Sequence, residues 1–284
     1  MNHTIIEIEG KSISYSEWGN QNQPTMVCFH GLAGSALYSF SVLQQHLSQQ
    51  FRIIVLDQPG HGRSGSFDQE SDYLFSNLAE WYRKVFAELG LTDFYLVGHS
   101  WGADVALHFT KYHPDMVRGL ILLDGAFTFP HLQEGMTFEV TYEGWNQYMD
   151  NAKYSNWEEI IKEYRGYTKN WTSQIEQVVP TIFTDDYQLI ATKFTVLSII
   201  KAFFAESFVE AYAHIKVPVL LVHATEPQEL DTAREKGIEK IKEEIEDVTV
   251  VSIDAGHMLQ WDDPDRVAAE ILQFANKLPK QTIK

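Results

Sequence analysis

One pentapeptide constrains the fold of this chain more than any other feature: Gly-His-Ser-Trp-Gly at residues 98–102. It follows a short apolar run, residues 94–97, and precedes a helical pattern over residues 101–112. A strand that turns directly into a helix holds such a serine in a strained conformation and points its hydroxyl above the sheet. Side chains in place of the two glycines would collide with neighbouring backbone, and the amides of the following helix favour negative charge nearby. The pattern therefore predicts an α/β chain with Ser100 as a nucleophile.

Short apolar runs alternate with helical patterns on both sides of this serine, which predicts strands buried between layers of helices. The first residues alternate apolar and polar side chains around a Gly-Lys turn, which is typical of an antiparallel hairpin. The apolar runs that suit strands lie at 4–9, 12–18, 25–29, 52–56, 94–97, 119–123, 217–222 and 248–253. Between the sixth and seventh central runs, residues 126–212 read as helices and hold about half of the aromatic side chains. The domains are therefore predicted to be a core, 1–125 and 213–284, and a helical segment, 126–212.

A serine is a weak nucleophile and needs a base, for which His257 is the candidate. It lies in a loop of small residues directly after the last apolar run, where it can reach the ends of the strands. Acyl transfer also needs backbone N–H groups that stabilise an oxyanion. Small residues at 30–34 let the backbone approach a ligand, so the amides of Leu32 and Trp101 are the predicted donors.

Two further residues of this loop, Gly31 and His30, are predicted to contact the substrate. Bracing of the loop is the alternative role for His30, and the same role is expected for His99. Cys28 is expected only to pack within a strand. Asp104 and His108 lie four residues apart on a helix, which predicts a stabilising pair on its surface.

Four segments together resemble the α/β-hydrolase superfamily over nearly the whole chain. In order, they are the His-Gly loop at residues 30–34, the stretch Asp-Gln-Pro-Gly-His-Gly-Arg-Ser at 57–64, the turn at Ser100, and Gly256-His257 followed by Pro264. The resemblance implies a mostly parallel eight-stranded sheet with flanking helices. It also implies that residues 126–212 form a cap inserted after the sixth strand.

The acid of the catalytic triad is the point at which the chain departs from the family pattern. The resemblance implies an acid after the seventh strand, three residues past a glycine, but alanine and proline occupy those two positions here. Glu226 lies one residue early and is the first choice. Asp124, after the sixth strand, is the second choice, and Glu229 and Asp231 remain as further alternatives. The segment around Glu226 also resembles lactonases that open N-acyl-homoserine lactones.

These residues predict a serine hydrolase that forms an acyl-enzyme and cleaves a small, largely apolar carboxylic ester or lactone. An aromatic-rich insertion favours an apolar pocket for such a substrate. One alternative is an aminopeptidase that resembles proline iminopeptidases, in which cap carboxylates would hold the substrate ammonium. The candidates for that role are Glu134, Glu139, Glu143, Glu158 and Glu159. The other alternative is a ligand receptor of the same fold without turnover, because the acid is displaced.

Charge and composition argue against other classes of partner. The chain carries 39 acidic and 22 basic residues, a formal net charge of −17, which repels phosphate backbones and anionic lipids. Neither nucleic acid nor a membrane is therefore expected as a partner. One cysteine and no signal-peptide pattern favour a cytoplasmic location. No motif for a metal or a nucleotide is found, so no cofactor is expected, and the oligomeric state is left open.

Overall fold

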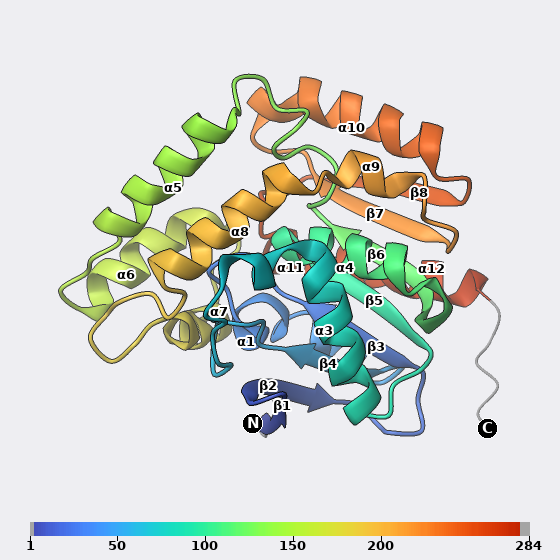
Figure 1. Cartoon of the computed structure of the whole chain (residues 1–284), viewed down its shortest axis with the longest axis horizontal. Helices are drawn as coiled ribbons and strands as arrows, with labels where there is room; N and C mark the ends of the chain where they lie inside the picture. The colour runs from blue at the N-terminus through green and yellow to red at the C-terminus, as the bar shows by residue number, and fades with distance from the viewer. Residues whose placement is uncertain (1–2, 279–284) are drawn as a thin grey trace.

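A computed structural model describes residues 3–278 of the chain, which form an α/β structure around one eight-stranded sheet (Figure 1). The strands are β1 (His3–Ile8), β2 (Lys11–Trp18), β3 (Thr25–Phe29), β4 (Arg52–Leu56), β5 (Phe94–His99), β6 (Val117–Leu123), β7 (Val219–Ala224) and β8 (Val248–Ile253). Their order in the sheet is β1-β2-β4-β3-β5-β6-β7-β8. Strand β2 pairs antiparallel with β1 and β4, and the remaining pairs are parallel. The predicted mostly parallel, eight-stranded sheet with flanking helices is confirmed.

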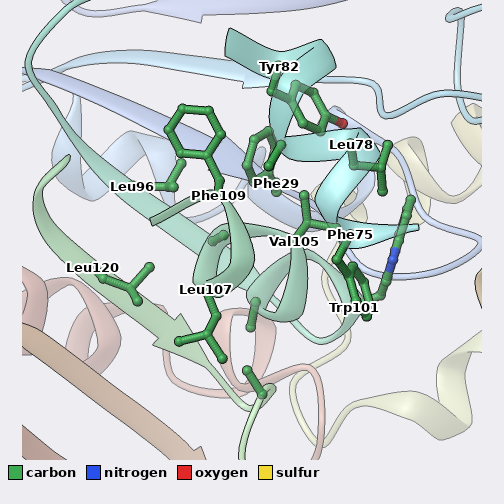
Figure 2. Packing of buried hydrophobic residues seen from close by; sticks show 14 of the residues in the cluster. Phe29, Phe75, Leu78, Tyr82, Leu96, Trp101, Val105, Leu107, Phe109 and Leu120 are labelled. Carbon is green, nitrogen blue, oxygen red and sulfur yellow. The ribbon is translucent and has the colours of Figure 1, made fainter. Parts of the chain in front are cut away.

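Helices cover both faces of the sheet, which is why the central strands are apolar on both sides. One face packs against α3 (Phe75–Glu88), α4 (Trp101–Tyr112), α9 (Phe208–Tyr212) and α10 (Asp231–Glu244). The other packs against α1 (Ala36–Phe40), α2 (Gln44–Leu47), α11 (Leu259–Asp262) and α12 (Pro264–Lys277). In β5, Phe94 and Leu96 enter the first layer, whereas Tyr95 and Val97 enter the second. Figure 2 shows the first layer, in which residues of α3 and α4 pack around Phe29.

The strand at residues 217–222 begins two residues later than the sequence predicts. Pro218 lacks a backbone N–H and cannot donate to a neighbouring strand, although its carbonyl accepts from the amide of Leu120 at 2.9 Å. The regular pairing of β7 therefore starts at Val219 and extends to Ala224. This shift brings Ala224 to the same edge of the sheet as the end of β6.

Residues 126–212 join β6 to β7 and are helical, as their composition indicates. They contain α5 (Phe138–Asn151), α6 (Trp157–Tyr164), α7 (Ser173–Val178), α8 (Lys193–Ala205) and α9. Each of these helices begins after a Ser, Thr or Asn whose side chain accepts a hydrogen bond from the first turn. Figure 1 shows α5, α6 and α8 to the left of the sheet. The division of the chain into a core and a cap at these boundaries stays a prediction.

Five short 3₁₀ helices complete the fold: η1 (Glu70–Tyr73), η2 (Pro114–Met116), η3 (Arg165–Tyr167), η4 (Val179–Ile182) and η5 (Gln228–Leu230). No helix within residues 3–278 has both the length and the apolar character needed to cross a lipid bilayer.

Candidate active site

Ser100 occupies the turn between β5 and α4 with φ 54° and ψ −126°. This conformation is rare for a residue with a side chain, so the predicted strain at the serine is confirmed. Two backbone hydrogen bonds hold it: the Ser100 amide donates to the Leu123 carbonyl at 3.0 Å, and the Ser100 carbonyl accepts from the Ala103 amide at 2.8 Å. The strained residue is thus tied to the end of β6 and to the first turn of α4.

The glycines on both sides of Ser100 are required by close backbone contacts. A Cβ atom at Gly98 would lie 2.1 Å from the carbonyl oxygen of Gly102. A Cβ atom at Gly102 would lie 2.3 Å from the carbonyl oxygen of Phe29, at the end of β3. The segment that follows β6 has the same requirement, since a Cβ atom at Gly125 would lie 2.3 Å from the Ser100 carbonyl oxygen. Three glycines therefore allow three chain segments to meet at the serine.

Gly102→Ala is expected to lower the free energy of unfolding by about 1–3 kcal/mol, because the new methyl group must displace the end of β3. It is also expected to lower kcat, since that displacement moves the loop after β3 relative to Ser100. Gly144→Ala is the matched control, because Gly144 is exposed on α5 with no atom within 4 Å of its Cβ position. The control is expected to be neutral or stabilising by about 0.5–1 kcal/mol. Urea unfolding of both variants checks this, and equal stabilities would contradict it.

His257 follows β8 and pairs with Asp124, which follows β6. The His257 Nδ1 atom lies 2.6 Å from Asp124 Oδ2, and the other carboxylate oxygen accepts from the Ala224 amide at 2.9 Å. The Asp124 side chain is 11% exposed and that of His257 is 54% exposed. Burial acts to raise the pKa of Asp124, but the hydrogen bond and charge of His257 and the bond from the Ala224 amide outweigh it and hold the pKa below its usual value. Asp124 is therefore a carboxylate, and the Nδ1 atom of His257 must carry the proton that they share.

Glu226, the first choice for the acid, lies elsewhere. Its Oε1 atom forms an ion pair with Lys169 Nζ at 2.8 Å, and the same ammonium contacts Asp254 at 3.1 Å. No hydrogen bond joins Glu226 to His257 within the part of the chain that the structure describes. The preference for Glu226 is thus corrected by the geometry, which places the second choice, Asp124, against the histidine.

The two remaining alternatives for the acid are not beside His257 either. Asp231 accepts a hydrogen bond from Arg234 Nη1 at 2.8 Å, at the start of α10. Glu229 lies in η5 with an exposed side chain, at the edge of a cavity described below.

His99 braces the loop that carries His257, in agreement with its expected role. Its Nε2 atom lies 2.9 Å from the His257 carbonyl oxygen, and the two rings are 5.0 Å apart. Burial and the nearby His257 lower the pKa of His99 to about 3, so its ring is neutral at pH 7. Because a carbonyl can only accept, the Nε2 atom of His99 carries the proton.

The loop after β3 presents backbone amides to Ser100. A Cβ atom at Gly31 would lie 3.1 Å from Ser100 Cβ, so the loop passes directly over the nucleophile. Within it, the Ala33 amide donates to His61 Nε2 at 3.1 Å. The amides of Leu32 and Trp101, by contrast, have no acceptor among residues 3–278. They are free to donate to an oxyanion, which is the role that the sequence predicts for them.

His30 is fully buried beneath this loop and does not border either cavity described below. Its Nε2 atom accepts from the Gln58 amide at 2.9 Å, and its Nδ1 atom lies 2.7 Å from the Gly31 carbonyl oxygen. Both ring nitrogens are therefore occupied by backbone groups. The expected contact between His30 and a substrate is corrected to the bracing role, whereas Gly31 does border a cavity.

Two cavities meet at the candidate site, and Leu32, Ser100, Trp145 and His257 border both. The inner cavity has a volume of about 370 Å³ and is largely apolar. Its apolar lining is Phe127, Phe129, Trp145, Ile200, Phe203 and Leu230. The outer cavity is wider and more open, with a volume of about 760 Å³. Four tyrosines border it: Tyr38, Tyr148, Tyr164 and Tyr167.

One residue in the wall of the inner cavity, Asp104, differs from its predicted position. Asp104 was expected on the surface with His108, but these residues are only 3% and 1% exposed. His108 instead stacks on Phe75 with ring centroids 4.7 Å apart, and its ring nitrogens have no hydrogen-bond partner in the described chain. The signal was present, because nearly every neighbour in residues 101–112 is apolar, and a helix that is apolar all round is buried.

Among residues 3–278, no group of three or more His, Cys, Asp or Glu side chains is arranged to hold a metal ion.

Comparisons with known proteins agree with the fold described above. The sequence pattern of a family described as "alpha/beta hydrolase fold" matches residues 24–264. A serine hydrolase-like protein of Danio rerio is 23% identical over 93% of this chain and 86% of its own length. A serine hydrolase-like protein of Mus musculus is 36% identical over 39% of this chain, and the match spans 36% of the mouse protein. Among solved structures, E-2-(acetamidomethylene)succinate hydrolase superimposes with a TM-score of 0.75 at 19% identity, covering 97% of this chain and 99% of that one.

Proposed function

Because the chain belongs to the alpha/beta hydrolase fold family, we propose that it is a serine hydrolase that cleaves a carboxylic ester or lactone. Membership in the family confirms the resemblance carried by four segments of the sequence, and it supports hydrolysis as the general reaction. The observation that carries the narrower proposal is the 2.6 Å contact between His257 and Asp124, beside a strained serine. A serine, a histidine and an acid in this relation can perform acyl transfer.

In the proposed reaction, the hydroxyl of Ser100 attacks the substrate carbonyl carbon while its proton moves to Nε2 of His257. The amides of Leu32 and Trp101 stabilise the resulting oxyanion, and each such donor contributes about 3 kcal/mol. His257 then gives its proton to the leaving alkoxide, and the C–O bond breaks to leave an acyl-enzyme. Water, activated by His257, attacks that ester and releases the acid and a free Ser100.

Asp124 supports this cycle through its charge and its position. As a carboxylate, it fixes the proton on Nδ1 of His257, which leaves Nε2 free to act as the base. It also offsets the positive charge that the ring gains when Ser100 is deprotonated. Its second oxygen is held by the Ala224 amide, so the carboxylate has little freedom to turn away.

The lining of the inner cavity supports an ester or lactone rather than a peptide with a free amino terminus. An aminopeptidase would need unpaired carboxylates near Ser100 to bind an ammonium group. The five acidic side chains considered for that role, Glu134, Glu139, Glu143, Glu158 and Glu159, border neither cavity. Two other acids, Glu226 and Glu229, border the outer cavity rather than the inner one: Lys169 forms an ion pair with Glu226, and Glu229 lies in η5 with an exposed side chain.

Covalent labelling tests the proposal. Diethyl p-nitrophenyl phosphate is expected to phosphorylate Ser100: an O–P bond forms at the serine, and p-nitrophenolate leaves. About one equivalent of p-nitrophenolate should be released per chain, and mass spectrometry of the digested protein should find the adduct on the peptide that contains Ser100. Two results would contradict the proposal and favour a ligand receptor: no label on the folded wild-type protein, or the same extent of labelling on the wild type and on Ser100→Ala.

A further inference from the structure

Asp104 places a carboxyl group in the wall of the inner cavity, one turn of α4 beyond the nucleophile. Four residues of helix rise about 6 Å. The carboxyl group of Asp104 can therefore face a part of the substrate that is several bonds away from the carbonyl carbon attacked by Ser100. It is 3% exposed, and the cavity around it is mostly apolar. The reaction described above does not use it. The backbone amides of Ala126 and of Asp104 itself donate to this carboxyl group, but no side chain does.

Asp104 has no ion-pair partner among the described residues. Arg234 borders the same cavity, but its Nη1 atom donates to the Thr225 and Pro227 carbonyls and to Asp231. Among the described residues, no basic side chain forms an ion pair with Asp104. Burial raises the pKa of Asp104 well above its usual value, and the backbone amides of Ala126 and of Asp104 itself only partly oppose this.

An uncharged carboxyl group has a proton to donate. The hydroxyl of Tyr212, close enough for the charge of Asp104 to affect its pKa, donates to the Ala126 carbonyl at 2.5 Å. Within residues 3–278, no side chain forms an ion pair with Asp104, and its only hydrogen-bond partners are backbone amides. The Asp104 side chain borders the inner cavity, so a substrate that lies there could accept the proton in a hydrogen bond.

The inner cavity suits the acyl part of the substrate. With an open-chain ester, the alcohol is the first product and leaves while the acyl group is still bonded to Ser100, whereas the alcohol of a lactone stays attached to the acyl chain. The outer cavity is the more open of the two and borders Gly256 and His257, so it gives the alcohol a way out. The acyl chain then remains in the smaller, mostly apolar inner cavity, which Asp104 borders.

We propose that Asp104 is a specificity-determining residue whose carboxyl group donates a hydrogen bond to an oxygen on the acyl part of the substrate. The preferred substrate class is then an ester or lactone of an oxo- or alkoxy-substituted acid rather than of a plain fatty acid. This proposal rests on the proposed serine hydrolase function and extends it to the substrate. A site built to bind a polar group discriminates strongly against an analogue that lacks it.

The test compares p-nitrophenyl hexanoate with its 4-oxo and 5-oxo derivatives. For each enzyme, the ratio of kcat/KM between an oxo ester and the plain ester is divided by the ratio of their rates in buffer alone. The wild type is expected to favour one oxo ester by about tenfold or more. Asp104→Leu is expected to lose that preference, whereas Asp104→Asn keeps most of it because its amide group can donate. Each ratio is measured on one preparation, so a partly unfolded sample does not alter it.

Gln133→Leu is the matched control, since Gln133 borders the same cavity but its amide already donates to Thr128 Oγ1 at 3.1 Å. It should keep the wild-type preference. The proposal is overturned if the wild type has no preference, if Asp104→Leu keeps it, or if Gln133→Leu loses it equally. Asp104→Ala replaces the leucine variant if that protein does not fold. Failure of the serine hydrolase function would differ, because none of the three esters would then be hydrolysed and Ser100 would take no phosphate label.

Discussion

Ser100→Ala is expected to lower kcat for p-nitrophenyl esters by about 10⁵- to 10⁶-fold, with KM changed by less than about threefold. The alanine removes the atom that forms the acyl-enzyme, whereas the walls of both cavities and the oxyanion amides stay in place. The variant should also fold, because the strained backbone at residue 100 is tolerated by alanine about as well as by serine. Initial rates against acyl chain length, measured for both proteins, check this.

Two controls make the result specific to Ser100. Ser155→Ala changes an exposed serine outside both cavities and should keep the wild-type rate. Circular dichroism should show the same unfolding transition for Ser100→Ala and the wild type within about 1 kcal/mol. If a correctly folded Ser100→Ala retained more than about a hundredth of the wild-type kcat, Ser100 would not be the nucleophile.

Asp124→Asn is expected to lower kcat by about 10⁴-fold, while Glu226→Gln changes it by less than about threefold. An asparagine in place of Asp124 is neutral and can present an N–H to the ring, which would move the ring proton to the nitrogen that must act as the base. Glu226 loses only its ion pair with Lys169, which is half-exposed and therefore weak. Each substitution changes an acid into its amide, so volume is nearly constant and the two variants control for one another.

Single-turnover rates with a p-nitrophenyl ester separate the effect of Asp124 on chemistry from product release. The acylation rate itself should fall in Asp124→Asn, since His257 acts as the base in that step. The opposite ranking, with Glu226→Gln the slower variant, would mean that the loop after β7 moves Glu226 to His257 in the working enzyme.

Much of the fold was predictable from local patterns. The apolar runs identify the strands because a strand buried on both faces needs apolar residues at successive positions. The turn at Ser100 was predictable because a side chain at Gly98 or Gly102 would clash with neighbouring backbone, so glycine is required at both positions. The start of β7 was predicted two residues too close to the N-terminus, because Pro218 interrupts the pairing of the strand without interrupting the apolar run.

The acid was harder to predict because spacing along the chain does not fix which strand end lies beside His257. β6 and β7 are neighbours in the sheet, so acids after either strand can reach the same histidine. Only the fold shows that Glu226 faces Lys169, a residue of the segment between those strands. Asp104 was misjudged for a related reason: four-residue spacing describes one face of a helix but does not say whether that face meets water.

The hydrogen bond between His99 and the backbone of His257 has a mechanical consequence. His99 directly precedes Ser100 in the chain. Its hydrogen bond to the His257 backbone therefore links the residue that gives up the proton, Ser100, to the residue that accepts it, His257. Movement of the helices that surround the cavities can change the space for a ligand without changing the distance between Ser100 and His257. Substitutions in the surrounding helices can therefore change which substrates fit while the distance between Ser100 and His257 stays the same.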